Sequence, residues 1–142
     1  MLILLTTFIF TTTMLVKTRK QRRNEMLMRN RKATKVARKR LKKGFVFMKN
    51  NQPNEFFEEN TNALWGYLSD KFSIPRATLS RETAAERLSE KGVSEEYIKE
   101  IVGIIDDCEF ARYAPAKDKH DNMESIYYNS INIISKIEQN LR

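Results

Sequence analysis

The chain has 142 residues, enough for one membrane anchor and one soluble domain of about 90 residues with a modest core. A single cysteine, Cys108, excludes an intrachain disulfide and a cysteine-based zinc site, and it fits a reducing compartment. The net charge of +8 is unevenly distributed. Residues 1–50 hold fifteen Lys and Arg against one Glu, whereas residues 51–142 hold eleven against seventeen Asp and Glu. A basic N-terminal region therefore precedes an acidic remainder.

Residues 1–16, MLILLTTFIFTTTMLV, form an apolar run without a charged residue, Pro or Gly. A helix there presents apolar side chains and five Thr hydroxyls, which can donate to carbonyls of their own helix. Its length is roughly 24 Å at about 1.5 Å per residue, somewhat less than the ~30 Å hydrocarbon core of a bilayer. We predict a short transmembrane segment over residues 1–16. A buried core helix of a soluble protein is the alternative.

The charges around this run predict its orientation. Lys17, Arg19, Lys20, Arg22 and Arg23 follow it directly, and nothing basic precedes it. A signal peptide has the opposite order, and Lys and Arg within about 15–20 residues of a span are retained on the cytoplasmic side. We expect these five side chains to contact the membrane surface and the remainder of the chain to face the cytoplasm.

Residues 17–50 predict a basic juxtamembrane helix that continues the span, because apolar residues recur at steps of three and four. Three partners are open for its charges: anionic lipid, which the position beside a span favours; an acidic surface of the same chain or of another protein; and nucleic acid. No aromatic residue for base stacking occurs over residues 17–43. A soluble basic regulator that binds nucleic acid through residues 17–43 is therefore the less favoured alternative.

The second half of this segment carries the candidate lipid or partner contacts, which are Arg38, Lys39, Arg40, Lys42 and Lys43. If a protein surface is the partner, a narrow apolar stripe between the charges would make the contact: Ala33, Val36, Ala37 and Leu41.

Residues 51–142 predict a cytoplasmic bundle of about four helices, so the fold class is all-α. The first helix begins at Pro53 and stops at Ile74-Pro75, and Ser80 and Ser94 cap the next two. A polar loop over residues 116–122 is expected before the terminal helix. Helical spacing assigns these residues to the core: Phe56, Phe57, Ala63, Leu64, Tyr67, Leu68, Phe72, Ala84, Ala85, Leu88, Ile98, Ile101, Val102, Ile105, Cys108, Met123, Ile126, Tyr127, Ile131, Ile134, Ile137 and Leu141.

Residues suited to catalysis or metal binding are few. His120 is the only histidine and falls in the expected polar loop. Asp106, Asp107 and Glu109 are adjacent on a helix and point in different directions, unlike the alternating ligands of a calcium loop. Cys108 falls on an apolar helix face, which predicts a buried hydrophobe. Phosphate-loop, dinucleotide and nucleophile-elbow patterns do not occur. We therefore predict no enzyme activity, no cofactor and no metal site.

The order of motifs resembles the cytoplasmic C-terminal part of aerotolerance proteins of the BatD type over nearly the whole chain. The most specific pieces are RNRKATKVARKRLKK, LWGYLSDKF and CEFARYAP. The resemblance implies a non-enzymatic, single-pass protein of the bacterial inner membrane. It also implies a role in oxygen or stress tolerance together with von Willebrand A-domain membrane proteins and a MoxR-type AAA+ ATPase. In that family a large extracytoplasmic β-rich region precedes the span, so we expect this sequence to be a fragment, or Met1 to be an internal methionine.

Overall fold

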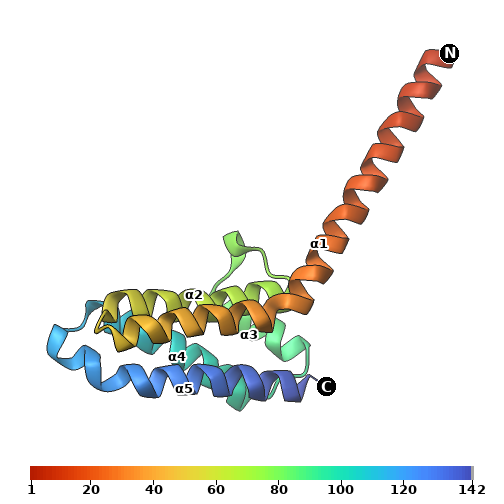
Figure 1. The fold of residues 1–142 in the computed structure, drawn as a ribbon. Coiled ribbons are helices and arrows are strands. Elements are labelled where there is room, and N and C mark those ends of the chain that lie inside the picture. The colour runs from red at the N-terminus through yellow and green to blue at the C-terminus, as the bar shows by residue number, and fades with distance from the viewer. Residues whose placement is uncertain (142) are drawn as a thin grey trace.

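The structure, a computed structural model, describes residues 1–141 apart from the side chains of residues 116–121. Helices account for nearly all of it, and no strand occurs in the described residues (Figure 1). This confirms the all-α prediction. In chain order the elements are α1 (Leu2–Lys49), α2 (Pro53–Phe72), the 3₁₀ helix η1 (Arg76–Thr78), α3 (Arg81–Glu90), α4 (Glu95–Tyr113) and α5 (Ala116–Asn140).

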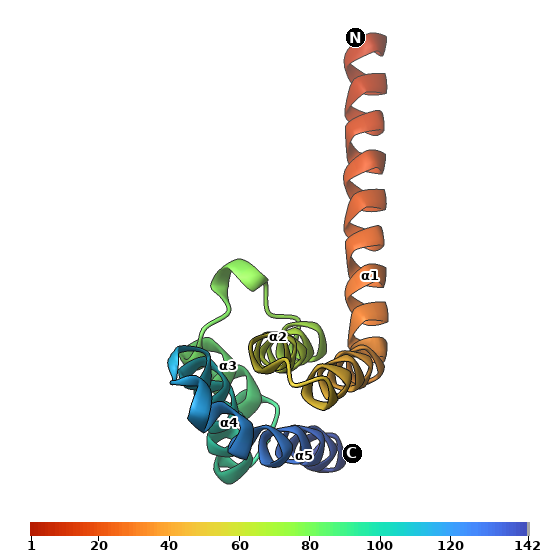
Figure 2. The ribbon, with the colours of Figure 1, turned by 60° about the vertical axis from the view of Figure 1, so that its left-hand side comes forward.

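Helix α1 has two parts with different surroundings. Residues 2–29, which we call the stalk, project away from the other helices, whereas residues 30–49, the packed segment, lie along α2 after a change of direction (Figures 1 and 2). The packed segment buries Ala33, Ala37, Leu41 and Gly44. The prediction that one helix continues from the apolar run through the basic residues is confirmed.

The packed segment, α2, α4 and α5 form a four-helix bundle. The packed segment contacts α2 and α5, and α4 contacts the same two helices from the other side, while α3 packs outside against α4 and α2 (Figure 2). The predicted bundle of about four helices is confirmed, but its membership differs from expectation. Part of α1 occupies the place expected for α3: its residues Ala33, Ala37, Leu41 and Gly44 are buried against the bundle, and Gly44 lies against the Phe56 ring.

The predicted core residues are buried, with a few at its edge. Ala85, Val102, Tyr127, Ile131 and Leu141 are half-buried and pack against the core from outside. Three buried isoleucines, Ile74, Ile104 and Ile133, were not predicted as core residues. The remaining members of the predicted set are buried as expected.

Local signals fix most of the helix ends. Ser80 and Thr83 form a reciprocal capping box at the start of α3, and the Ser94 hydroxyl accepts from the Tyr97 amide at 3.5 Å at the start of α4. Gly92 has φ of +81°, as its position after α3 requires. Ser73, with φ of 54°, ends α2 just before the expected Ile74-Pro75 stop.

The polar loop predicted over residues 116–122 is wrong, because α5 begins at Ala116. Pro115 precedes it with φ of −57°, a value already suited to a helix start. Polar residues can form the first turns of a helix, so the polar composition of residues 116–122 was not sufficient evidence for a loop. The His120 side chain lies outside the described residues.

Candidate membrane anchor and docking surfaces

The apolar half of the stalk, residues 2–16, is exposed. Its large side chains from Leu2 to Val16 are 56–82 % exposed. By length and composition, α1 is the only helix among the described residues that could cross a membrane, and the apolar window is 0 % buried. The alternative of a core helix therefore does not describe this segment.

The threonines of this half satisfy their own hydroxyls within the helix, as expected. Thr6 donates to the Ile3 carbonyl at 2.8 Å, and Thr7 donates to the Leu4 carbonyl at 2.9 Å. The same pattern, with a carbonyl three or four residues earlier, holds for Thr11, Thr12 and Thr13. The surface of this half therefore presents no unpaired hydroxyl donor, which is what a hydrocarbon environment requires.

The predicted membrane-surface residues Lys17, Arg19, Lys20, Arg22 and Arg23 are all exposed on the stalk. None of them forms an ion pair within the part of the chain that the structure describes. Because they occupy fewer than two full turns of helix, they surround the stalk immediately beyond the apolar run.

The second basic group is divided by the packing of α1. Arg40 donates to Glu59 of α2 at 3.2 Å, and the Lys43 ammonium lies 3.7 Å from the other oxygen of the same carboxylate. The Glu59 side chain is largely buried, at 13 % exposure. These two cations therefore dock on the protein's own acidic surface.

The other three members of this group point to solvent. Arg38, Lys39 and Lys42 are exposed and have no ion pair among the described residues. Further exposed cations lie earlier on α1 at Arg31, Lys32 and Lys35. We call these six residues the outer basic face of the packed segment.

The apolar stripe predicted between the charges is mostly used inside the protein. Ala33, Ala37 and Leu41 are each 1 % exposed, whereas Val36 is 42 % exposed. The stripe therefore packs against its own bundle, and only Val36 is available to another molecule.

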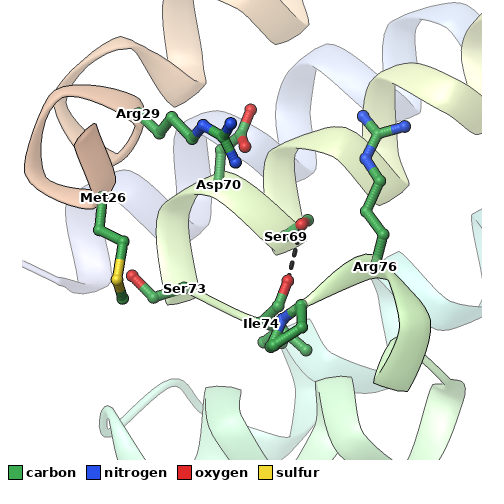
Figure 3. A pocket seen from close by; sticks show the side chains of 8 residues that line it. Met26, Arg29, Ser69, Asp70, Ser73, Ile74 and Arg76 are labelled. Carbon is green, nitrogen blue, oxygen red and sulfur yellow. Dashed lines mark hydrogen bonds between the residues drawn. The ribbon is translucent and has the colours of Figure 1, made fainter. Parts of the chain in front are cut away.

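A cavity of about 290 Å³ lies where the stalk meets the bundle. Figure 3 shows the Arg29 side chain directed toward Asp70, while Arg76 reaches along α2 from η1. The Asn30 side-chain amide donates to the Lys71 carbonyl nearby. The lining residues are Met26, Arg29, Ser69, Asp70, Ser73, Ile74, Pro75 and Arg76.

Sequence reasoning missed the hydrogen bond between Asn30 and Lys71. The two residues are about forty positions apart, and spacing along one helix does not predict such a pair. This hydrogen bond ties the start of the packed segment to the end of α2.

Glu138 connects three helices at the same end of the bundle. It accepts from the Tyr67 hydroxyl at 2.7 Å and from the Lys71 ammonium at 3.2 Å. Burial opposes ionisation of Glu138, but hydrogen bonds from Tyr67, Lys71 and Thr34 outweigh it and lower the pKa of the carboxyl. Thr34 belongs to α1, so this network also ties the packed segment to α2 and α5.

A small polar group lies inside the core. The Asn60 amide donates to the Ser130 hydroxyl at 2.9 Å and to the Cys108 sulfur at 3.3 Å. Burial raises the pKa of the Cys108 thiol to about 11, although the hydrogen bond from Asn60 acts in the opposite direction. Cys108 is 0 % exposed, so the structure supports the prediction of a buried hydrophobe.

Two aromatic side chains are exposed at the end of the bundle away from the stalk. Phe110 and Tyr113, on the last turns of α4, are 77 % and 89 % exposed. They border a cavity of about 470 Å³ between α4 and α5, whose other lining includes Ile126 and Asn129. Figure 1 shows this α4–α5 junction at the opposite end of the bundle from the change of direction in α1.

Comparisons of the chain with protein-family models, with curated proteins and with solved structures give no match. Among the described residues, no group of three or more His, Cys, Asp or Glu is arranged to hold a metal ion. The case for a function therefore depends on the surfaces described above.

Proposed function

We propose that the protein is a non-enzymatic scaffold of the BatD type, anchored in the bacterial inner membrane by residues 1–16, with its bundle in the cytoplasm. The observation that carries this proposal is the contrast within α1, whose packed segment buries one face against the bundle whereas its apolar half, residues 2–16, buries none. Leaving a large apolar side chain in water rather than burying it costs about 1.5–3 kcal/mol. Insertion into a bilayer removes that cost for all the large apolar side chains of residues 2–16 at once.

The charges support the orientation. Lys17, Arg19, Lys20, Arg22 and Arg23 lie at the bundle side of the apolar half, and Lys and Arg flanking a span stay in the cytoplasm. Each gains about 1 kcal/mol near an anionic surface. In this arrangement the stalk emerges through the headgroup layer with its basic residues against lipid phosphates.

The exposed aromatic end supports the protein-binding part of the proposal. Phe110 and Tyr113 belong to residue types enriched at binding interfaces, and they flank a cavity far from the stalk. The partners that we propose, von Willebrand A-domain membrane proteins and a MoxR-type ATPase, follow from the sequence resemblance alone.

Membrane anchoring is tested by fractionation of bacterial cells that express the full chain. We expect it to stay with membranes in moderate salt, and we expect Leu5→Arg with Ile9→Arg to release it. Val36→Arg with Val46→Arg, at exposed positions of the packed segment, is the matched control. A wild-type chain in the soluble fraction would instead favour the basic regulator that binds nucleic acid.

Orientation is tested with a cysteine at Asn129, an exposed position on α5, in a Cys108→Ala background. An impermeant thiol reagent should label it only after the cells are broken. Labelling in intact cells would show that the bundle faces the outside and would contradict the proposal.

The partner surface is tested by replacing Phe110 and Tyr113 together with Ser. Because both side chains are exposed, the melting temperature should hardly change. Cross-linking to a von Willebrand A-domain partner should fall, whereas the exposed Val46→Ser control should leave it intact. If the double variant cross-links as well as the Val46→Ser control, the partner does not contact Phe110 and Tyr113.

A further inference from the structure

The connection between α2 and α3 stands clear of the bundle. In both views η1 rises from the bundle on the side from which the stalk leaves (Figures 1 and 2). Pro75, Arg76, Ala77 and Thr78 are exposed. No described residue of the chain therefore covers the tip of this connection.

This connection has a defined shape. Ser69 donates to the Ile74 carbonyl at 2.7 Å, Thr78 donates to the Pro75 carbonyl at 3.1 Å, and the Thr83 hydroxyl lies 2.8 Å from the Thr78 carbonyl. Ile74, at 4 % exposure, anchors its base in the core. A surface held in shape in this way loses little conformational entropy on binding.

The charged residues of this connection and its two ends are all basic. Residues 71–81 contain Lys71, Arg76 and Arg81 and no acidic residue. Lys71 and Arg81 pair with carboxylates elsewhere in the bundle, but Arg76 has no ion pair among the described residues. Its guanidinium lies over α2, 3.7 Å from the position of a Cβ added at Gly66. Arg76 is thus an exposed cation without an acidic partner.

We propose that η1 is a second membrane contact, in which Arg76 binds phosphate-bearing headgroups of the anionic bilayer that holds residues 1–16. The inference rests on the proposed anchoring, because the apolar half of α1 determines which side of the bundle faces lipid. From Val16 to Arg29 the stalk covers about 20 Å, of which the headgroup layer takes roughly 5–7 Å. η1 projects into the remaining gap (Figures 1 and 2).

The consequence is a fixed orientation of the bundle. A single helix through a bilayer leaves the attached domain free to rotate about the helix axis. A second contact away from that axis removes this freedom, because η1 follows α2 directly and the Asn30–Lys71 hydrogen bond ties α2 to α1. The aromatic end of the bundle is then held at a constant position relative to the membrane.

The experiment uses the full chain in vesicles, with Cys108→Ala and one fluorophore attached through a cysteine at Ala77. A second sample carries the fluorophore at Asn132, exposed on α5, the helix on the far side of the bundle from η1 (Figure 1). Lipids with a headgroup quencher are added to phosphatidylglycerol or to neutral phosphatidylcholine vesicles. In anionic vesicles, we expect quenching at Ala77 to exceed that at Asn132, because attraction of Arg76 to anionic headgroups brings η1, and not α5, to the lipid surface.

Arg76→Gln should reduce the quenching at Ala77 in anionic vesicles, and Arg76→Lys should preserve most of it. Vesicle flotation of the same samples separates the two proposals. A chain that does not float would overturn the membrane anchoring itself. A chain that floats, but whose Ala77 is quenched no more than Asn132, would overturn only the contact at η1. Equal quenching with Arg76→Gln would overturn headgroup binding by Arg76, and equal quenching in neutral vesicles would overturn the requirement for anionic lipid.

Discussion

At the scale of single residues, isoleucines make up a large part of the buried core. Ile105 is 0 % exposed, and we expect Ile105→Ala to lower the free energy of unfolding by about 2–5 kcal/mol, through lost apolar burial and the cavity left behind. Urea unfolding measures this loss. Val46→Ala, at a position 55 % exposed, is the control and should change stability by less than about 0.5 kcal/mol. Similar small effects for both would contradict the assignment of Ile105 to the core.

Cys108 predicts a dependence of stability on alkaline pH. Its thiol keeps the proton up to about pH 11 in the folded protein, whereas an unfolded thiol loses it near pH 8.5–9. Below pH 8 both states hold the proton, so the stabilising contribution is complete. Between pH 9 and 11 only the unfolded state ionises, and the free energy of unfolding falls by up to about 2–3 kcal/mol.

Cys108→Ala isolates this effect, because the pKa of Tyr67 is also raised by burial and contributes in both proteins. The difference in stability between wild type and variant should be constant below pH 8 and should shift in favour of the variant toward pH 11. Chemical unfolding at a series of pH values measures it. A constant difference over the whole range would show that the thiol is accessible to water.

At the scale of elements, α1 belongs to two environments, and the bundle depends on its packed segment. Residues 51–142 without α1 would expose the face of α2 that includes Phe56, which the packed segment covers at Gly44. Each large apolar side chain returned to water costs about 1.5–3 kcal/mol, a large part of the 5–15 kcal/mol that a domain has. We expect residues 51–142 alone to melt without cooperativity, whereas residues 30–142 melt cooperatively. Equal melting curves, followed by circular dichroism, would show that the bundle forms without α1.

The sequence was informative wherever a signal is local. Helical spacing identified the buried faces of α2, α4 and α5, and Ser80 and Ser94 marked helix starts through their own hydroxyls. Ile104 and Ile133 were missed because each lies beside the main apolar stripe and is covered by a neighbouring helix, which periodicity within one helix does not report.

The candidate surfaces were predictable only in part, for a related reason. The basic residues of the stalk were identified from their order after the apolar run, but Arg40 and Lys43 differ from Lys39 and Lys42 only through Glu59, which reaches them from α2. Such distinctions arise from contacts between helices and not from spacing along one of them.

At the scale of the whole molecule, the cations on α1 form two groups, one around the stalk and one on the outer basic face of the packed segment. Because α1 changes direction between them, the two groups lie on parts of the helix that run in different directions (Figure 1). If anionic lipid is the partner of both groups, attraction should weaken as salt shortens the Debye length from ~10 Å at 0.1 M to ~3 Å at 1 M. We therefore expect residues 17–142 to bind anionic vesicles, to ignore neutral ones and to be released by high salt.

Variants of residues 17–142 then distinguish lipid from a protein partner for the outer basic face. Replacing Arg38, Lys39 and Lys42 with Gln should weaken vesicle binding, while Arg40 and Lys43 stay unchanged because they hold Glu59. Val36→Ser removes the one exposed residue of the apolar stripe without changing charge, so it should have little effect on an electrostatic contact. Vesicle sedimentation measures both. A larger loss from Val36→Ser, or undiminished binding to neutral vesicles, would assign this face to a protein partner, because only apolar packing depends on that side chain.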